Sequence, residues 1–381
     1  MTDAGRAASR PLRVLVAPDS FKGTCPADAA AQALAQGWLS RRPGDDVVLR
    51  PLADGGEGTL DVMAASVPGS RVVEVGAVRG PLGAPTLGRY LVLPDATAVV
   101  ELAVASGLHL VPRPDPLRAS TFGTGQIIRE ALRRGTSRLV LAVGGSATTD
   151  GGSGLLQALG LRALDSAGGD VPAGGAGLLR LHRIEVGALV AAPAGGVQVL
   201  VDVVNPLLGA QGAAAVFAPQ KGAAAADIAT LERALTRWAD LSGGDPQAPG
   251  AGAAGGTAYG VATWWGARLV PGADHVAELV GLDAAVAAAD VVITGEGRFD
   301  TTSLGGKVVG AVLRRAAGRR TEVDVVCGQA DTGLRVDGPV VPRVLALADV
   351  AGSVEAATTD ARRWLSVAGA HLAEAREART R

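Results

Sequence analysis

One pattern recurs along this chain and limits what it can fold into. A short β-branched run is followed by a cluster of glycine and acidic residues and then by a helical stretch, at 13–23 (RVLVAPDSFKG), 47–58 (VVLRPLADGGEG) and 291–307 (VVITGEGRFDTTSLGGK). A β-branched run bounded by glycine predicts a buried strand. A helix behind it supplies free N–H groups at the carboxyl end of the strand, where α/β sheets bind ligands. The pattern therefore predicts an α/β protein with an anion or nucleotide site.

The composition indicates a globular protein. The chain has 381 residues, 48% of them hydrophobic, and a net charge of -1, so nothing in it favours nucleic acid or an anionic membrane as a partner. No apolar run reaches membrane-spanning length, and the first ten residues lack a signal-peptide core. Two cysteines far apart, Cys25 and Cys327, provide no disulfide framework. We expect a cytoplasmic protein.

Two domains are expected from the order of the patterns. Residues 1–70 and 285–381 carry five short strands, which predict a Rossmann-like parallel-sheet domain built from both chain ends. From Val72 the sequence pattern changes to adjacent strands with Gly/Pro turns and no helix between them, which is typical of antiparallel pairing. Residues 71–284 are therefore expected to form an inserted mixed α/β domain.

Lysine usage points to candidate functional residues. Of 36 basic residues only Lys22, Lys221 and Lys307 are lysine, and each adjoins a glycine. A lysine ammonium is a compact point charge on a flexible stem, whereas a guanidinium is a rigid planar fork, so the two are not interchangeable at a phosphate. This favours a phosphate-binding role for Lys22 and Lys307. For Lys221, such a role and a chance position beside a glycine are about equally supported.

The glycine-acid loops carry the parts that phosphoryl transfer needs: a phosphate cradle, carboxylates for Mg²⁺, and a base for the attacking hydroxyl. One such loop alone more often holds a cap or a turn, but the chain has five, all at expected strand ends. Asp202, Lys22 and Lys307 are the catalytic candidates. The substrate-binding candidates are Asp19, Ser20, Phe21, Asp54 and Arg298. The nucleotide-binding candidates are Gly144, Gly145, Ser146, Thr149, Asp150, Gly295 and Gly297. The candidate metal ligands are Glu57, Asn205, Glu296 and Asp300.

Two other classes of function remain open at this point. A hydroxy-acid reductase is disfavoured because no Gly-x-Gly-x-x-Gly follows the first strand. A non-catalytic sensor of small acids is disfavoured by the five intact glycine-acid loops and by the lack of a basic DNA-binding element. None of the four histidines has a spacing suited to Zn²⁺.

Eight motifs, in order, resemble the bacterial type 1 glycerate kinase family from about Val14 to Val350. They are VLVAPDSFKGT, PLADGGEGT, STFGTGQII, GGSATTDGGSG, DVVNPLLG, VFAPQKGA, PGAGAAGG and VVITGEGRFD with the following GGK. The resemblance implies ATP- and Mg²⁺-dependent phosphorylation of D-glycerate, with an active site in the cleft between two α/β domains. It favours 2-phosphoglycerate as the product; a 3-phosphoglycerate-forming or related hydroxy-acid kinase is the alternative. The expected partner is the small-molecule substrate alone, without nucleic acid or membrane, and the expected state is a monomer or homodimer.

Overall fold

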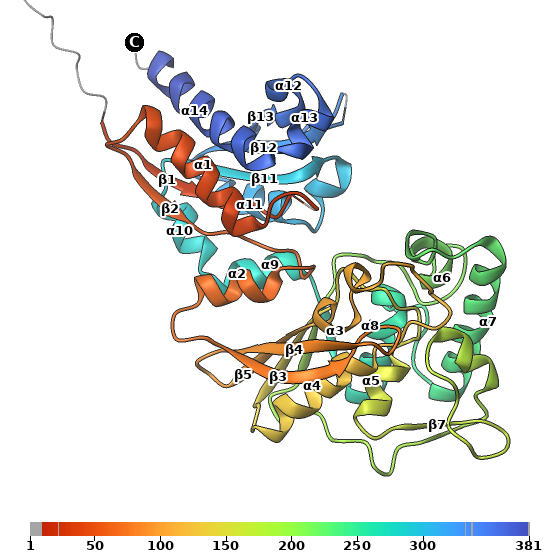
Figure 1. Cartoon of the computed structure of the whole chain (residues 1–381). Coiled ribbons are helices and arrows are strands. Elements are labelled where there is room, and N and C mark those ends of the chain that lie inside the picture. The colour runs from red at the N-terminus through yellow and green to blue at the C-terminus, as the bar shows by residue number, and fades with distance from the viewer. Residues whose placement is uncertain (1–9, 22, 332, 337, 380–381) are drawn as a thin grey trace, which may run out of the picture. The chain divides into compact units, whose positions relative to one another are not determined.

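The computed structural model describes residues 10–21, 23–331, 333–336 and 338–379 (Figure 1). The chain divides into two compact units. Unit 1 comprises Met1–Ala53 and Val276–Arg381, and unit 2 comprises Asp54–His275. These divisions lie 17 and nine residues before the expected boundaries at 70/71 and 284/285. The glycine-acid loop at Asp54 and the helix after it therefore belong to unit 2.

Unit 1 contains a five-stranded parallel sheet with the order β13-β12-β11-β1-β2 (Figure 1). Its strands are β1 (Arg13–Val16), β2 (Asp46–Leu49), β11 (Val291–Phe299), β12 (Glu322–Ala330) and β13 (Arg343–Ala346). Every neighbouring pair in this sheet is parallel. The predicted parallel sheet of five strands from both chain ends is thereby confirmed.

The helices of unit 1 are α1 (Ala27–Arg41), α10 (Leu282–Ala288), α11 (Val308–Ala316), α12 (Leu347–Ala351), α13 (Val354–Thr359) and α14 (Ala361–Arg379). Side chains of α1, α12, α13 and α14 belong to one apolar core, whereas α10 and α11 pack against each other and against strands of the sheet. The last two helices, α13 and α14, are separate because Asp360 leaves the helical conformation. Helices α1 and α14 meet closely through glycine: a Cβ on Gly369 would lie 2.2 Å from the Leu34 carbonyl oxygen. Trp38 and Leu365 are fully buried in the same core.

Unit 2 contains a mixed six-stranded sheet with the order β10-β9-β6-β5-β4-β3. Its strands are β3 (Arg71–Arg79), β4 (Pro85–Val92), β5 (Thr97–Glu101), β6 (Arg138–Ala142), β9 (Val197–Leu200) and β10 (Arg268–Val270). Strands β5, β6, β9 and β10 are parallel to one another. Strands β3, β4 and β5 pair antiparallel, as the sequence pattern after Val72 predicted. A separate hairpin is made by β7 (Arg162–Leu164) and β8 (Arg183–Glu185).

The helices of unit 2 pack against this sheet or against one another. They are α2 (Thr59–Ser66), α3 (Ala103–Ser106), α4 (Phe122–Arg133), α5 (Ser153–Ala158), α6 (Ala213–Phe217), α7 (Ala225–Ser242), α8 (Ala253–Trp265) and α9 (Gly272–Leu279), the last continuing into unit 1. In α4 the side chains of Ile127, Ile128 and Ala131 are buried, a spacing of one and four residues that forms one apolar face. Within the described residues, no helix combines the length and the hydropathy needed to span a bilayer.

Candidate active site

The carboxyl ends of four parallel strands define one edge of the unit 2 sheet. Glu101 at the end of β5 pairs with Ala142 at the end of β6, Ala142 pairs with Leu200 at the end of β9, and Leu200 pairs with Val270 at the end of β10. Residues that follow these strands must therefore lie near one another. They include Gly144, Asp202 and Gly272, so this edge gathers a predicted nucleotide residue and the predicted base.

The loop at 54–58 lies directly on this edge, and glycine makes the approach possible. The Gly144 N–H donates to the Gly55 carbonyl at 3.0 Å, and a Cβ on Gly144 would lie 2.4 Å from the Gly56 Cα. A Cβ on Gly55 would lie 2.8 Å from the Cβ of Leu200. A side chain fits at neither position, because the neighbouring atoms leave no room for a Cβ. The glycines here are required by close packing of two loops.

Glu101 fixes the other end of the same loop. Its carboxylate is buried and accepts hydrogen bonds from the N–H groups of Gly58, at 3.0 Å, and Leu60, at 3.1 Å. These are the first amides of α2, where a negative charge is favoured by the helix dipole. Burial is the largest influence on this carboxyl and raises its pKa. Glu101 was not predicted as a site residue; the signal was an acid closing the apolar run AVVE.

Asp202 and Asp54 adjoin the same glycine on this edge. The Gly272 N–H donates to Asp202 Oδ1 at 2.9 Å, and Ala273 N–H also bonds to that carboxylate. A Cβ on Gly272 would lie 1.9 Å from the Asp54 carbonyl oxygen and 3.1 Å from Asp202 Oδ2. Burial, then the nearby Asp54 carboxylate, raises the pKa of Asp202 to about 8, although the two N–H groups oppose this. Asp202 is therefore a carboxylate tuned towards neutral pH.

The glycine-rich loop at 144–154 is held in place from within the chain. Asp150 is completely buried and accepts hydrogen bonds from Thr121 N–H at 2.8 Å, Thr121 Oγ1 at 2.9 Å, Gly152 N–H at 3.1 Å and Gly154 N–H at 3.3 Å. With four donors on its two oxygens, this carboxylate holds the loop. Ser146 and Thr149 are buried as well. Of the five residues of this loop that were predicted to bind the nucleotide, only Gly144 and Gly145 are therefore partly accessible.

Lys221 is buried beneath the same loop. Its Nζ donates to the Thr148 carbonyl at 2.5 Å and to Ser146 Oγ at 3.4 Å, and Ser146 Oγ lies 2.9 Å from Thr148 Oγ1. Burial lowers the pKa of the lysine to about 7, while the charge of Asp150 opposes the shift. Burying an ammonium is costly without partners, so its retention indicates a specific role in shaping this loop. The rarity of lysine in the chain was the signal for this residue.

The corresponding edge of unit 1 begins after β1. Asp19 N–H donates to the Gly295 carbonyl at 2.8 Å, and Asp19 Oδ1 accepts from Ser20 N–H at 2.6 Å. Phe21 is 2% exposed and belongs to the unit 1 core, so it packs beneath the loop rather than facing solvent. The predicted catalytic Lys22 lies outside the described residues.

The sequence predicted a loop after Ile293, and this prediction is wrong. Strand β11 continues to Phe299, with Gly295 opposite Val326 and Glu296 opposite Cys327 of β12. The glycine is required by strand packing, because a Cβ on Gly295 would lie 2.0 Å from the Val326 carbonyl oxygen. Glycine was interpreted as a turn signal, whereas here it lets two strands approach closely. A nucleotide-binding role for Gly295 and Gly297 stays a prediction.

The charged groups after β11 contact their own chain. The Arg298 guanidinium pairs with Asp331 at 2.8 Å. Asp300 Oδ1 caps the short 3-10 helix at Thr301–Leu304, accepting from Thr302 N–H at 2.8 Å and Thr302 Oγ1 at 2.6 Å. The Thr302 hydroxyl is the largest cause that lowers the pKa of Asp300, and the charge of Lys307 adds to it. Lys307 itself is the N-cap residue of α11.

The predicted Mg²⁺ ligands differ in accessibility. Among the described residues, no three His, Cys, Asp or Glu side chains gather into a metal cage. Glu57 has an exposed side chain 3.7 Å from His109 Nδ1, and Asn205 is partly buried with its Nδ2 donating to the Gln211 carbonyl at 2.9 Å. Glu296 is 6% exposed. Because Mg²⁺ keeps several waters and needs only one or two carboxylates beside substrate phosphates, the exposed Glu57 carboxylate fits it best.

Comparison with known proteins gives a consistent result. The model of the Glycerate kinase family matches residues 14–377. "Glycerate kinase" of Bacillus subtilis (strain 168) is 42% identical over 314 residues, covering 80% of this chain and 82% of that protein. "Glycerate 2-kinase" of Escherichia coli (strain K12) is 39% identical over 306 residues, covering 78% and 80%. A crystal structure attributed to glycerate kinase 2 from Salmonella typhimurium LT2 superposes with a TM-score of 0.79 at 36% identity, covering 97% of this chain and 99% of that one.

Proposed function

Because this chain belongs to the glycerate kinase family, a family of ATP-dependent small-molecule kinases, we propose that it phosphorylates D-glycerate and releases 2-phosphoglycerate. The relative named "Glycerate 2-kinase" supports the choice of product. The observation that carries the proposal is the half-buried Asp202 carboxylate, which lies near Asp54 at the carboxyl ends of the parallel strands and has a pKa of about 8. The assignment to the type 1 subgroup rests on the motif resemblance.

The proposed chemical step uses Asp202 as the general base. One Asp202 oxygen accepts the proton of the 2-hydroxyl group of glycerate, while the hydroxyl oxygen forms a bond to the γ-phosphorus of ATP. The bond between that phosphorus and the bridging oxygen breaks, and ADP leaves. The N–H groups of Gly272 and Ala273 hold the carboxylate in place, while burial and then the charge of Asp54 raise its pKa and thus its basicity. A base with a pKa near the working pH is the most effective one.

The other candidates are proposed to serve binding. Gly144 and Gly145 are partly accessible and stay proposed nucleotide-binding residues. Glu57 would hold Mg²⁺, which when bound neutralises charge on the transferred phosphoryl group. Asp19, Ser20, Arg298, Lys22 and Lys307 stay proposed ligands of the acid and the triphosphate, as does Glu296 for the metal. For Asp300, first a candidate metal ligand, we propose instead that it fixes the turn at Thr301–Leu304. A cytoplasmic location and a monomeric or dimeric state also stay predictions.

A coupled assay tests this proposal. The purified chain, ATP and Mg²⁺ are combined separately with D-glycerate, tartronate and hydroxypyruvate, ADP formation is followed, and the product is located by phosphorus NMR. We expect turnover to be fastest with D-glycerate and the new resonance to be that of 2-phosphoglycerate. A resonance of 3-phosphoglycerate would contradict the product assignment alone. Reduction of hydroxypyruvate with NAD(P)H and no ADP formation would contradict the kinase assignment itself.

A further inference from the structure

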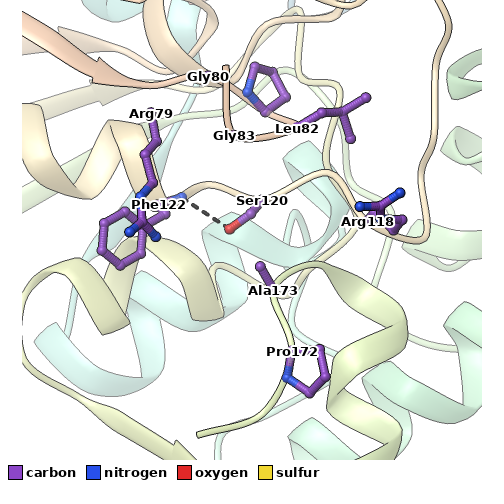
Figure 2. A pocket seen from close by; sticks show the side chains of 10 residues that line it. Arg79, Gly80, Leu82, Gly83, Arg118, Ser120, Phe122, Pro172 and Ala173 are labelled. Atoms are coloured by element: carbon purple, nitrogen blue, oxygen red, sulfur yellow. Dashed lines mark hydrogen bonds between the residues drawn. The ribbon is translucent and has the colours of Figure 1, made fainter. Parts of the chain in front are cut away.

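Unit 2 contains a hollow that the proposed reaction does not use. It is a pocket of about 450 Å³, within the range of small-molecule sites, and it lies between the turn at 80–83, the residues that lead into α4, and Pro172–Ala173 (Figure 2). None of its lining residues is among those that form the edge with Asp54, Gly144 and Asp202. A ligand in this pocket would therefore be held by a separate set of groups.

Two arginines line this pocket, and neither is neutralised by the chain. Figure 2 shows Arg79 and Arg118 on opposite sides of the Ser120 hydroxyl. Within the described part of the chain, no carboxylate lies within ion-pair distance of either guanidinium. Asp115, an acid near Arg118 in sequence, accepts from the backbone N–H of Arg118 instead. The pocket thus carries two positive charges that are available to a negatively charged ligand.

The arginine on the Phe122 side is oriented by that ring. The Arg79 Cζ lies 4.4 Å from the centroid of the Phe122 ring, so the guanidinium stacks on an aromatic face. Stacking occupies the face of the guanidinium and leaves the N–H donors along its edge available for a carboxylate or phosphate. The Arg79 N–H donates to Gln126 Oε1 at 2.8 Å, which fixes the backbone from which the side chain projects.

The walls of the pocket are preformed by backbone hydrogen bonds. Ser120 N–H donates to the Pro81 carbonyl at 2.9 Å, and Gly83 N–H donates to the Gly80 carbonyl at 3.0 Å, closing the turn. Ser120 is 6% exposed, and its Oγ accepts from Phe122 N–H at 3.3 Å, so the hydroxyl hydrogen can be directed to a ligand. A preformed site loses little ordering entropy when a ligand binds.

We propose that this pocket binds a small organic anion with a negative group at each end, of the phosphorylated hydroxy-acid class. One end would bind Arg79 and the other Arg118, with the Ser120 hydroxyl donating to the middle and Leu82 and Pro172 covering the carbon chain. Two cations match the charge of such an anion, and guanidinium forks suit both carboxylate and phosphate. The choice of phosphoglycerate as the probe rests on the proposed function. The inference that the pocket binds an anion with two negative ends rests on its charge and shape alone.

Hydrogen exchange followed by mass spectrometry tests the proposal, because it reports which segment is protected. The full chain is incubated with 2-phosphoglycerate, 3-phosphoglycerate or inorganic phosphate, and exchange at 79–84 and 117–122 is read separately from exchange at 54–58 and 200–204. We expect both phosphoglycerates to protect 79–84 and 117–122 at lower concentration than inorganic phosphate does. We expect Arg79→Gln and Arg118→Gln each to weaken that protection by about tenfold or more, the effect of losing one charge-assisted contact.

Arg113→Gln is the matched control, since Arg113 is exposed, close to Arg118 in sequence and outside the pocket. In this variant, phosphoglycerate should protect 79–84 and 117–122 as strongly as it does in the wild type. If Arg79→Gln fails to fold because Phe122 loses its stacked partner, Arg118→Gln carries the test alone. The proposal is overturned if 79–84 and 117–122 are not protected by millimolar phosphoglycerate, if Arg118→Gln leaves protection unchanged, or if inorganic phosphate protects equally well. Turnover of glycerate is measured separately, so loss of the kinase assignment would not alter this readout.

Discussion

The two units carry similar glycine-acid sequences after parallel strands, yet they use them differently. On the unit 2 edge, Asp202 is half-buried, and this partial burial, followed by the charge of the nearby Asp54, raises its pKa to about 8. On the unit 1 edge, Asp300 caps a 3-10 helix, and its pKa is lowered mainly by the hydroxyl of Thr302. The first carboxylate has a pKa that suits the proposed general base, and the second caps a turn. The difference teaches that the surroundings of an acid, rather than the pattern in which it occurs, decide whether it can do chemistry.

The largest effect that this comparison predicts is on the rate of Asp202→Asn. The amide keeps the size of the side chain but cannot accept the proton of the hydroxyl group. We expect kcat/KM for D-glycerate to fall by about 10²- to 10⁴-fold, the usual contribution of a general base. In the wild type, kcat/KM should rise with pH until Asp202 is ionised, levelling off above about pH 8. A variant that retains more than a tenth of the activity would remove Asp202 from the mechanism.

The same substitution should stabilise the fold at high pH. The pKa of Asp202 is higher in the folded protein, at about 8, than the ordinary value of 3.8, so the folded state binds the extra proton between these values. Wild-type stability is therefore lost as the pH rises through that window, and Asn has no such loss. We expect the Tm of Asp202→Asn to exceed that of the wild type most clearly above pH 8, with the gap closing towards pH 4. Equal Tm values at pH 9 would show that ionised Asp202 is not destabilised by its burial and by Asp54.

Lys221→Met should have the next largest effect, and it also concerns the unit 2 edge. Without Nζ, the Thr148 carbonyl loses its donor, and the loop at 144–149 shifts. Misplacement of this kind far from the reacting atoms can reduce kcat/KM by about 10²-fold. The pKa of Lys221 is about 7 when folded and 10.5 ordinarily, so wild-type stability should rise as the pH increases across that range. Urea unfolding at pH 7 and pH 9.5 should detect that rise in the wild type and its loss in the variant.

Much of the fold followed from the sequence because it depends on local patterns. The five β-branched runs at the two chain ends became the parallel strands of unit 1, and the absence of helices after Val72 correctly indicated antiparallel pairing. The extension of β11 through Gly295 did not follow, because it depends on β12, which lies about 30 residues further along the chain. The sequence alone does not distinguish a glycine that lets a neighbouring strand approach from a glycine that makes a turn.

The candidate site was accessible from sequence only in part. The glycine-acid pattern led to Asp54 and Asp202, but the fact that both adjoin Gly272 depends on the register of β9 and β10. The rarity of lysine led to Lys221 without revealing that it is buried under the loop that carries Ser146. Local patterns therefore identified the residue types, whereas burial and charge neighbours came from strand pairing across long sequence separations.

The smallest expected effect is on Asp300→Ala, and it tests the comparison directly. Removing a cap of this type typically costs about 1 kcal/mol of stability. We expect a modest fall in Tm and a change in kcat/KM of less than about threefold at saturating Mg²⁺, because Asp300 serves the turn at Thr301–Leu304. Asp300→Asn is the matched control, since its amide oxygen can still accept from Thr302 N–H and should recover most of the lost stability. A loss of activity as large as that of Asp202→Asn, together with a raised Mg²⁺ requirement, would instead establish Asp300 as a metal ligand. The two edges would then both be chemical, and the distinction drawn between Asp202 and Asp300 would fail.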